Sequence, residues 1–263
     1  MHSASQAGAN TVVNGAYQQQ KTQLPSVGKS IGMIVVFMLV SYGVGLLVGF
    51  VYGAYLGITG PEGVADDQAL DQAFNAFVFS PAGFFWLFFV QSAVILPLVI
   101  WISHFKQQPW RETLAIKAVA GPVIGFWLLV VCGYMVISML ANTILDIQPG
   151  DMMQSVAGSR HLGLFLVVVF LAPVVEEFVF RGYLFRAWRY TKLGLRGTLV
   201  LTSVLFALLH GAQYPVIILG FLFILSVLLG LAREKTGSIW PPVAMHVGNN
   251  AVAGALIIYF GVV

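Results

Sequence analysis

Long apolar runs separated by short polar linkers are the feature that most restricts the fold of this 263-residue chain. A transmembrane helix needs about 20 largely apolar residues. Hydrocarbon offers no hydrogen-bond partners, so the backbone N–H and C=O groups of a segment that spans it must bond to one another, as they do in a helix. The sequence predicts an all-α, polytopic transmembrane helical bundle of about seven spans, with an additional interfacial or re-entrant helix allowed at residues 67–82. The predicted spans are residues 31–56, 84–105, 119–145, 162–188, 198–210, 216–232 and 240–260.

Composition excludes a soluble domain with a single membrane anchor. Charged residues make up 9% of the chain and hydrophobic residues 59%, whereas a soluble domain carries about 25% charged residues. The net charge of +3 does not indicate a nucleic-acid partner, because the basic residues lie at the ends of the predicted helices. Cys132 is the only cysteine, which excludes an intramolecular disulfide and a cysteine-based zinc cluster.

The charges of the linkers predict the orientation of the chain. Basic residues lie after the second, fourth and sixth runs, whereas acidic residues dominate the linkers after the first and third. Basic linkers mark the cytosolic side, so the N-terminus is predicted inside and the C-terminus outside. Residues 1–28 are polar and predict a disordered cytosolic tail. Residues 29–263 are then the transmembrane domain, with a predicted catalytic core at residues 162–260.

Two adjacent carboxylates and a guanidinium interrupt the fourth apolar run. Charge inside a membrane span is costly and usually marks a functional site. Glu177 and Arg181 are four residues apart, so they can pair on one helix face. Glu176 points about 100° away from Glu177 and can face a different neighbour. The two glutamates are therefore expected to have different environments, which suits one to act as a base and the other as a structural anchor.

Further polar side chains lie at matching depths in the fifth and seventh runs. Glu176 and His210 are each predicted ~18 Å from the inner membrane surface, and Asn250 ~15 Å. His246 and Asn250 share one helix face, as do Phe206 and His210, because each pair is four residues apart. We expect these groups to converge on one buried site that opens to the cytosol.

This combination of side chains suits the activation of water. A buried carboxylate beside a histidine can remove a proton from water. A second histidine and an asparagine amide can donate hydrogen bonds to a developing oxyanion, with each donor contributing ~3 kcal/mol. The residues thus predict a peptidase site that contains no nucleophilic side chain.

The three motifs together resemble those of the CPBP intramembrane proteases, the ABI family. The resemblance rests on Glu176-Glu177-x-x-x-Arg181, Phe206-x-x-x-His210 and His246-x-x-x-Asn250. This family includes type II CAAX prenyl endopeptidases and bacterial relatives linked to bacteriocin self-immunity. By resemblance, Glu176 and His210 activate the water and His246 and Asn250 form the oxyanion hole, while Glu177, Arg181 and Phe206 support the site.

The resemblance implies an integral, multi-pass protein of a bacterial plasma membrane, in contact with lipid and with a peptide or membrane-protein substrate, and without a cofactor. Alternative interpretations stay open at this point. Glu176, His210 and His246 could supply three ligands to zinc, leaving one position for water. A non-catalytic scaffold or bacteriocin immunity factor would bind a partner in the same cavity. A proton-coupled transporter is less supported, because the sequence shows no internal repeat.

Overall fold

The computed structural model describes residues 27–59, 67–104, 109–211 and 213–262, and the elements formed by these residues are all helical. The predicted all-α fold is therefore confirmed. In chain order the elements are α2 (Val27–Thr59), α3 (Asp67–Val78), α4 (Pro81–Ile102), α5 (Trp110–Thr113), α6 (Gly121–Leu145), α7 (Asp151–Val156), α8 (Leu162–Leu166), η1 (Val167–Leu171), α9 (Ala172–Glu177), η2 (Phe178–Leu184), α10 (Phe185–Arg189), α11 (Gly194–Leu209), α12 (Val216–Thr236), α13 (Trp240–Gly254) and η3 (Ala255–Tyr259).

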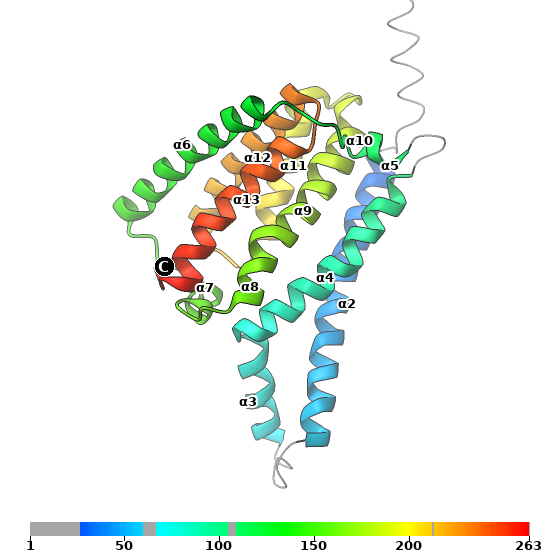
Figure 1. The fold of residues 1–263 in the computed structure, drawn as a ribbon. Coiled ribbons are helices and arrows are strands. Elements are labelled where there is room, and N and C mark those ends of the chain that lie inside the picture. Colours follow the sequence, from blue (N-terminus) through cyan, green and yellow to red (C-terminus); the bar gives the residue numbers. More distant parts are fainter. Residues whose placement is uncertain (1–26, 60–66, 105–108, 212, 263) are drawn as a thin grey trace, which may run out of the picture.

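Five of the described helices are long and apolar enough to cross a membrane: α2, α4, α6, the continuous helix from α8 to α10, and α12. The shorter α11, and α13 continued by η3, pack against them and complete the bundle. Figure 1 shows α6 at one edge of the bundle, α2 and α4 at the other, and the helix from α8 to α10 between them. The chain is thus an integral, multi-pass membrane protein, and about seven spans agree with this arrangement.

The observed helix limits differ from the predicted spans by a few residues. Helix α2 begins at Val27, inside the predicted tail, of which residues 1–26 lie outside the described part of the chain. The helix predicted at residues 67–82 is α3, which ends at Val78. Ser80 then caps α4, accepting a 3.0 Å hydrogen bond from the backbone N–H of Gly83. This cap and Pro81 at the first helical position start α4 three residues before the predicted span.

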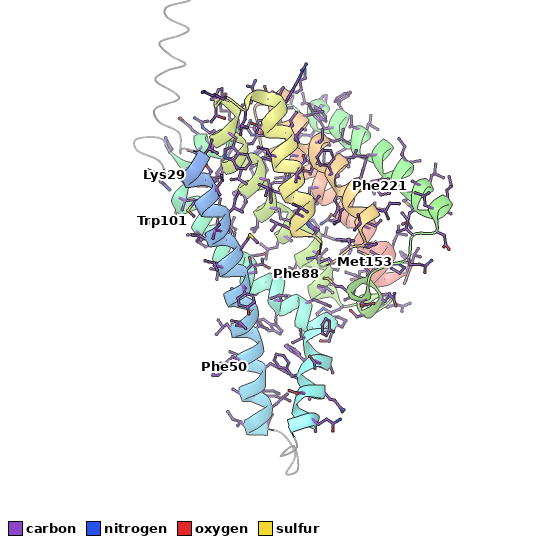
Figure 2. The ribbon with its side chains drawn as sticks, turned by 180° about the vertical axis from the view of Figure 1, so that it is seen from behind. Lys29, Phe50, Phe88, Trp101, Met153 and Phe221 are labelled. Carbon is purple, nitrogen blue, oxygen red and sulfur yellow. The ribbon has the colours of Figure 1, made fainter. Side chains whose placement is uncertain are left out.

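Helix α3 and the C-terminal half of α2 extend beyond one end of the bundle as a helical hairpin (Figure 1). Helix α2 has 33 residues, a length of about 50 Å. The rings of Tyr52 and Phe77 stack with their centroids 3.7 Å apart and hold the two helices together. A Cβ atom at Gly49 would lie 2.9 Å from the ring of Phe74, so a larger residue there would require this ring to move. Phe50 lies on this hairpin, with its side chain exposed (Figure 2).

The helix from α8 to α10 contains two π-helical segments, one on each side of the two glutamates. In η1 the backbone N–H of Ala172 bonds to the carbonyl of Val167, five residues earlier. The next residue is Pro173, which has no N–H. The carbonyl of Val168 therefore lacks a donor five residues further along its own helix. π-helical turns of this kind free backbone groups inside a membrane span and are frequent at functional sites.

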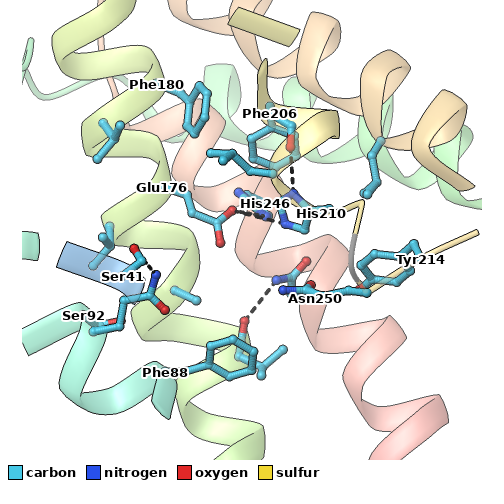
Figure 3. Close-up of a pocket in the computed structure, with 18 of the residues that line it drawn as sticks. Ser41, Phe88, Ser92, Glu176, Phe180, Phe206, His210, Tyr214, His246 and Asn250 are labelled. Carbon is cyan, nitrogen blue, oxygen red and sulfur yellow. Dashed lines mark hydrogen bonds and ion pairs between the residues drawn. The ribbon is translucent and has the colours of Figure 1, made fainter. Parts of the chain in front are cut away.

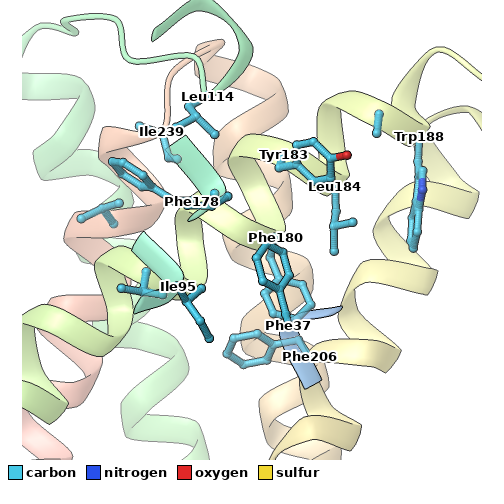
Figure 4. Packing of buried hydrophobic residues seen from close by; sticks show 14 residues of the cluster. Phe37, Ile95, Leu114, Phe178, Phe180, Tyr183, Leu184, Trp188, Phe206 and Ile239 are labelled. Carbon is cyan, nitrogen blue, oxygen red and sulfur yellow. The ribbon is translucent and has the colours of Figure 1, made fainter. Parts of the chain in front are cut away.

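A cluster of buried apolar side chains fills the bundle between the glutamates and the basic linkers. Phe180, Leu184 and Trp188 extend from η2 and α10 and pack with Phe37 of α2 and Phe206 of α11 (Figure 4). These side chains are almost completely buried. Moving such a side chain from water into an apolar phase stabilises a folded protein by about 1.5–3 kcal/mol. Lipid is itself apolar, however, so in a membrane these side chains stabilise the fold mainly through close packing. The cluster closes this end of the bundle.

Candidate active site

Three helices bring Glu176, His210 and His246 to the wall of one cavity of about 560 Å³ (Figure 3). Glu176 lies on α9, His210 at the C-terminal cap of α11, and His246 on α13. Oε2 of Glu176 is 4.0 Å from Nε2 of His210 and 3.7 Å from Nε2 of His246. The structure thus brings together residues that the sequence placed at similar depths, and their catalytic roles remain a prediction.

The two neighbouring glutamates have different environments, as expected from their positions on the helix. The side chain of Glu176 is 29% exposed and lines the cavity, whereas that of Glu177 is completely buried. Oε1 of Glu177 accepts hydrogen bonds of 2.9 Å from Nη1 of Arg181 and from Nδ1 of His246. Arg181 Nη2 also donates to the carbonyl and the hydroxyl oxygen of Ser226 on α12, at 2.8 and 2.7 Å. The predicted Glu177–Arg181 pair therefore connects α9, η2, α12 and α13.

The hydrogen bonds of the two histidines determine which ring nitrogen faces the cavity. His246 donates through Nδ1 to the carboxylate of Glu177, so its Nε2 is directed towards Glu176. His210 bonds through Nδ1 to the carbonyl oxygen of Phe206 at 2.8 Å. A carbonyl only accepts, so this Nδ1 carries the hydrogen and the neutral ring keeps an acceptor at Nε2. In the neutral form of the ring, Nε2 of His210 is therefore an acceptor that faces Oε2 of Glu176.

Phe206 packs against the charged and aromatic groups of the site from one side. Its side chain is 1% exposed. The ring centroid lies 4.8 Å from that of His210 and 5.7 Å from that of His246, and Arg181 Cζ is 5.0 Å from it. The guanidinium over the ring face gains a cation–π interaction that is strongest where water is excluded. Phe206 thus fixes both imidazole rings and partly compensates the buried charge of Arg181.

Asn250 lies one helical turn beyond His246 and lines the same cavity. Its Nδ2 donates a 3.0 Å hydrogen bond to the carbonyl of Val168, the carbonyl that Pro173 leaves without a helical donor. Its Oδ1 accepts a 3.2 Å bond from Nδ2 of Asn249. Both ends of the Asn250 amide are therefore held, and one N–H of its Nδ2 remains for a further acceptor.

The sequence did not identify several residues that hold the site together. Asn249 is one of them, because its Nδ2 donates to Oδ1 of Asn250 and so orients that amide. The adjacent second amide in the seventh span was the available signal. Ser226 gave no signal, because a serine in a membrane helix commonly bonds to its own helix. Pro173 could have indicated a free carbonyl near Val168, but only the structure shows that Asn250 reaches it.

Among the described residues, no group of three or more His, Cys, Asp and Glu side chains is arranged to hold a metal ion. The nitrogen and oxygen atoms of Glu176, His210 and His246 are a chemically suitable donor set for zinc. Zinc holds such donors at about 2.0–2.2 Å, which requires them to lie closer to one another than the observed 3.7 and 4.0 Å. Metal independence stays a prediction that chelation can test.

The cavity extends towards α7, away from the basic linkers. Met152, Met153 and Val156 of α7 line it, together with Ile257 and Ile258 at the far end of the seventh helix. No residue of the described basic linkers is part of the lining. The buried aromatic cluster of η2, α10 and α11 packs at the end nearer those linkers, and Phe180, Leu184 and Phe206 of this cluster also line the cavity. The expected opening of the site to the cytosol stays a prediction.

Fold and site together define a multi-pass membrane protein with a carboxylate and two histidines on a cavity within its helical bundle. Residues 158–252 match the family model described as type II CAAX prenyl endopeptidase Rce1-like. This part of the chain is therefore a domain of the Rce1-like family, which is a family of membrane proteases. All seven residues that the sequence analysis assigned to the site lie within the match. No curated protein and no solved structure matches the chain significantly.

Proposed function

We propose that this protein is an intramembrane endopeptidase that hydrolyses a peptide bond with water activated by Glu176 and His210. The observation that carries the proposal is the 4.0 Å separation of Glu176 Oε2 and His210 Nε2 on the wall of one cavity. A water molecule that makes two hydrogen bonds of ~2.8 Å spans acceptors roughly 4.5 Å apart. Oε2 of Glu176 is buried and has no hydrogen-bond partner among the described residues, and a water that donates a hydrogen to each of the two atoms would supply that partner.

The reaction then needs one proton carrier and no nucleophilic side chain. Glu176 takes a proton from the water as the oxygen attacks the carbonyl carbon of the substrate. The same carboxyl group gives the proton to the departing amine nitrogen when the tetrahedral intermediate breaks down. A general base of this kind contributes about 10²–10⁴-fold to a rate.

We infer that His246 and Asn250 stabilise the oxyanion of that intermediate. With a proton on both ring nitrogens, His246 would donate from Nδ1 to Glu177 and from Nε2 into the cavity. Arg181 and protonated His246 would then balance Glu177 and Glu176, leaving no net charge in the cluster, which limits the cost of burying these groups. The remaining N–H of Asn250 supplies a second donor. Each oxyanion donor of this type is worth about 10²–10³ in rate.

The surroundings of the site indicate its partners. The long apolar helices contact membrane lipid, and the Rce1-like match supports a peptide or membrane protein as substrate. We propose a bacterial plasma membrane as the location and a reaction without a cofactor. Activity that survives EDTA and 1,10-phenanthroline supports the metal-free mechanism, whereas loss that added zinc restores supports the zinc alternative.

Mass spectrometry of new peptide termini in cell membranes tests the proposed function. Cells that produce the wild-type protein are compared with cells that produce Glu176→Gln at the same level in the membrane. Termini that require Glu176 establish a protease and identify its substrate class. Identical termini in the two membranes, together with an unchanged cellular phenotype of the variant, would instead favour the non-catalytic scaffold or immunity factor.

A further inference from the structure

A hydrogen-bonded polar pair lies on the cavity wall formed by α2 and α4, outside the part of the chain that matches the family. Nε2 of Gln91 on α4 and Oγ of Ser41 on α2 are 2.6 Å apart. Both residues line the same cavity as Glu176. In the view of Figure 3, Glu176 lies between Ser41 and the two histidines. The pair thus belongs to a different wall of the cavity from His210 and His246.

The hydroxyl group of Ser41 fixes the orientation of the Gln91 amide. Ser41 Oγ donates its single hydrogen to the carbonyl of Phe37 at 2.8 Å. It can therefore only accept from Gln91, which places the NH₂ end of the amide against Ser41. The carbonyl oxygen Oε1 of Gln91 has no hydrogen-bond partner among the described residues, and it is not enclosed by protein atoms. An acceptor of fixed direction is thus presented at the cavity.

The position of Gln91 in its helix makes an acceptor without a hydrogen-bond partner unfavourable in free energy. Gln91 is the only amide side chain in α2 and α4, and it lies about 15 Å from either end of α4. A polar group at this depth is normally bonded to a neighbouring helix or serves a function. Ser41 bonds only to the NH₂ end of the amide. The hydrogen bond between the two helices therefore accounts for this end and leaves the carbonyl oxygen without a role.

We propose that Gln91 binds the substrate by accepting a hydrogen bond from a backbone N–H of an extended peptide segment. The rest of the cavity suits such a segment. Apolar side chains such as Phe88, Ile95 and Leu205 line the same cavity and would contact the side chains of an apolar peptide. The backbone N–H groups of the peptide need hydrogen-bond acceptors on the protein, because the hydrocarbon of the membrane supplies no acceptor. Ser41 is then a positioning residue that acts through Gln91. This inference rests on the proposed peptidase function.

Steady-state kinetics and binding together test the assignment. The probe is a fluorogenic, farnesylated peptide of the Cys-aliphatic-aliphatic-X type, a chemistry that the family match suggests. Gln91→Met keeps the length of the side chain and removes the amide. It is expected to raise KM about 5- to 10-fold, the value of one hydrogen bond, with little change in kcat. Ser41→Ala is expected to raise KM less, and to have no further effect when combined with Gln91→Met.

Ester analogues of the probe separate a hydrogen bond from a change in packing. Each analogue replaces one backbone N–H near the cleaved bond by an ester oxygen, and binding is measured by fluorescence anisotropy in the Glu176→Gln background. One analogue is expected to bind to Glu176→Gln about 5- to 10-fold more weakly than the unmodified probe does. The double variant Glu176→Gln/Gln91→Met is expected to bind this analogue and the unmodified probe equally well. Gln154→Met is the matched control, because this glutamine is exposed on α7, outside the cavity lining.

The two hypotheses fail in different ways. Cleavage of the probe with a KM that Gln91→Met leaves unchanged overturns the role of Gln91 and leaves the peptidase proposal intact. Equal ester penalties with and without Gln91→Met also overturn it. Binding that depends on Gln91 and on one N–H, without cleavage of any peptide, supports the binding role and contradicts the peptidase function.

Discussion

The helix from α8 to α10 and helix α2 are both long and apolar, yet they differ in how much of their surface is buried within the protein. In the most apolar 18-residue window, 44% of the residues of the α8–α10 helix are buried within the protein, against 17% in α2. The former carries Glu176, Glu177 and Arg181 in its interior. Helix α2 has a single charged residue, Lys29 near its first turn, and it exposes large apolar side chains along its length.

The difference shows what a membrane span needs before it can hold charge. Arg181 and Glu177 bond to each other and to groups on α12 and α13, which leaves only Nε of Arg181 and Oε2 of Glu177 without a partner among the described residues, so their helix must be surrounded by protein. Helix α2 is covered on one face only, and the polar group that it contributes to the cavity is the hydroxyl of Ser41. The buried helix is suited to chemistry, and the peripheral helices α2 and α4 to forming the opposite wall of the cavity.

The largest expected effect is on activity, at the centre of the buried helix. Glu176→Gln removes the proposed base and should lower the yield of wild-type-specific peptide termini at least 10³-fold, within the range for general base catalysis. Its thermal unfolding should match wild type, because Glu176 makes no hydrogen bond that holds helices together. Wild-type turnover in this variant would show that Glu176 is not the base.

The next effect concerns stability in the same helix. Arg181→Met leaves the buried carboxylate of Glu177 without its cationic partner, which should cost about 3–5 kcal/mol, measured by denaturant unfolding in detergent. The double variant Glu177→Gln/Arg181→Met removes both charges and should recover part of the loss. A double variant less stable than Arg181→Met would show that the carboxylate is held mainly by His246.

A smaller effect is expected where the first π-helical segment meets α13. Asn250→Ala removes one proposed oxyanion donor and should slow terminus formation about 10²-fold. Asn249→Ala removes only the bond that orients Asn250, so roughly 3- to 10-fold is expected, the value of one hydrogen bond. If Asn249→Ala slowed the reaction as much as Asn250→Ala, Asn249 would have to contact the substrate itself.

The smallest effect is expected in the peripheral hairpin of α2 and α3. Tyr52→Ala removes the stack on Phe77 and should lower stability by about 0.5–1.5 kcal/mol beyond the loss of contact area. Activity should stay at the wild-type level. Phe50→Ala is the control on the same helix, since Phe50 is 74% exposed. A loss of activity in Tyr52→Ala would show that the hairpin acts on the cavity, and the contrast between the two regions would no longer hold.

The sequence by itself determined the helical membrane fold, because the spacing and length of apolar runs leave only helices in a bilayer. It also predicted the Glu177–Arg181 pair, which depends on helix periodicity alone. The approach of Glu176, His210 and His246 followed from their similar depths, although depth along a helix does not determine which face meets which neighbour.

Only the tertiary structure decided how the groups are connected. The bond from His246 to Glu177 joins residues 69 positions apart, and the free carbonyl of Val168 matters only because Asn250 packs beside it. The packing of Phe180, Leu184 and Phe206 along the cavity could not be predicted, because linker charge indicates the side of the membrane and not how side chains pack inside the bundle. The Ser41–Gln91 pair could not be predicted either, since two polar residues in separate apolar helices acquire a role only when those helices are placed side by side.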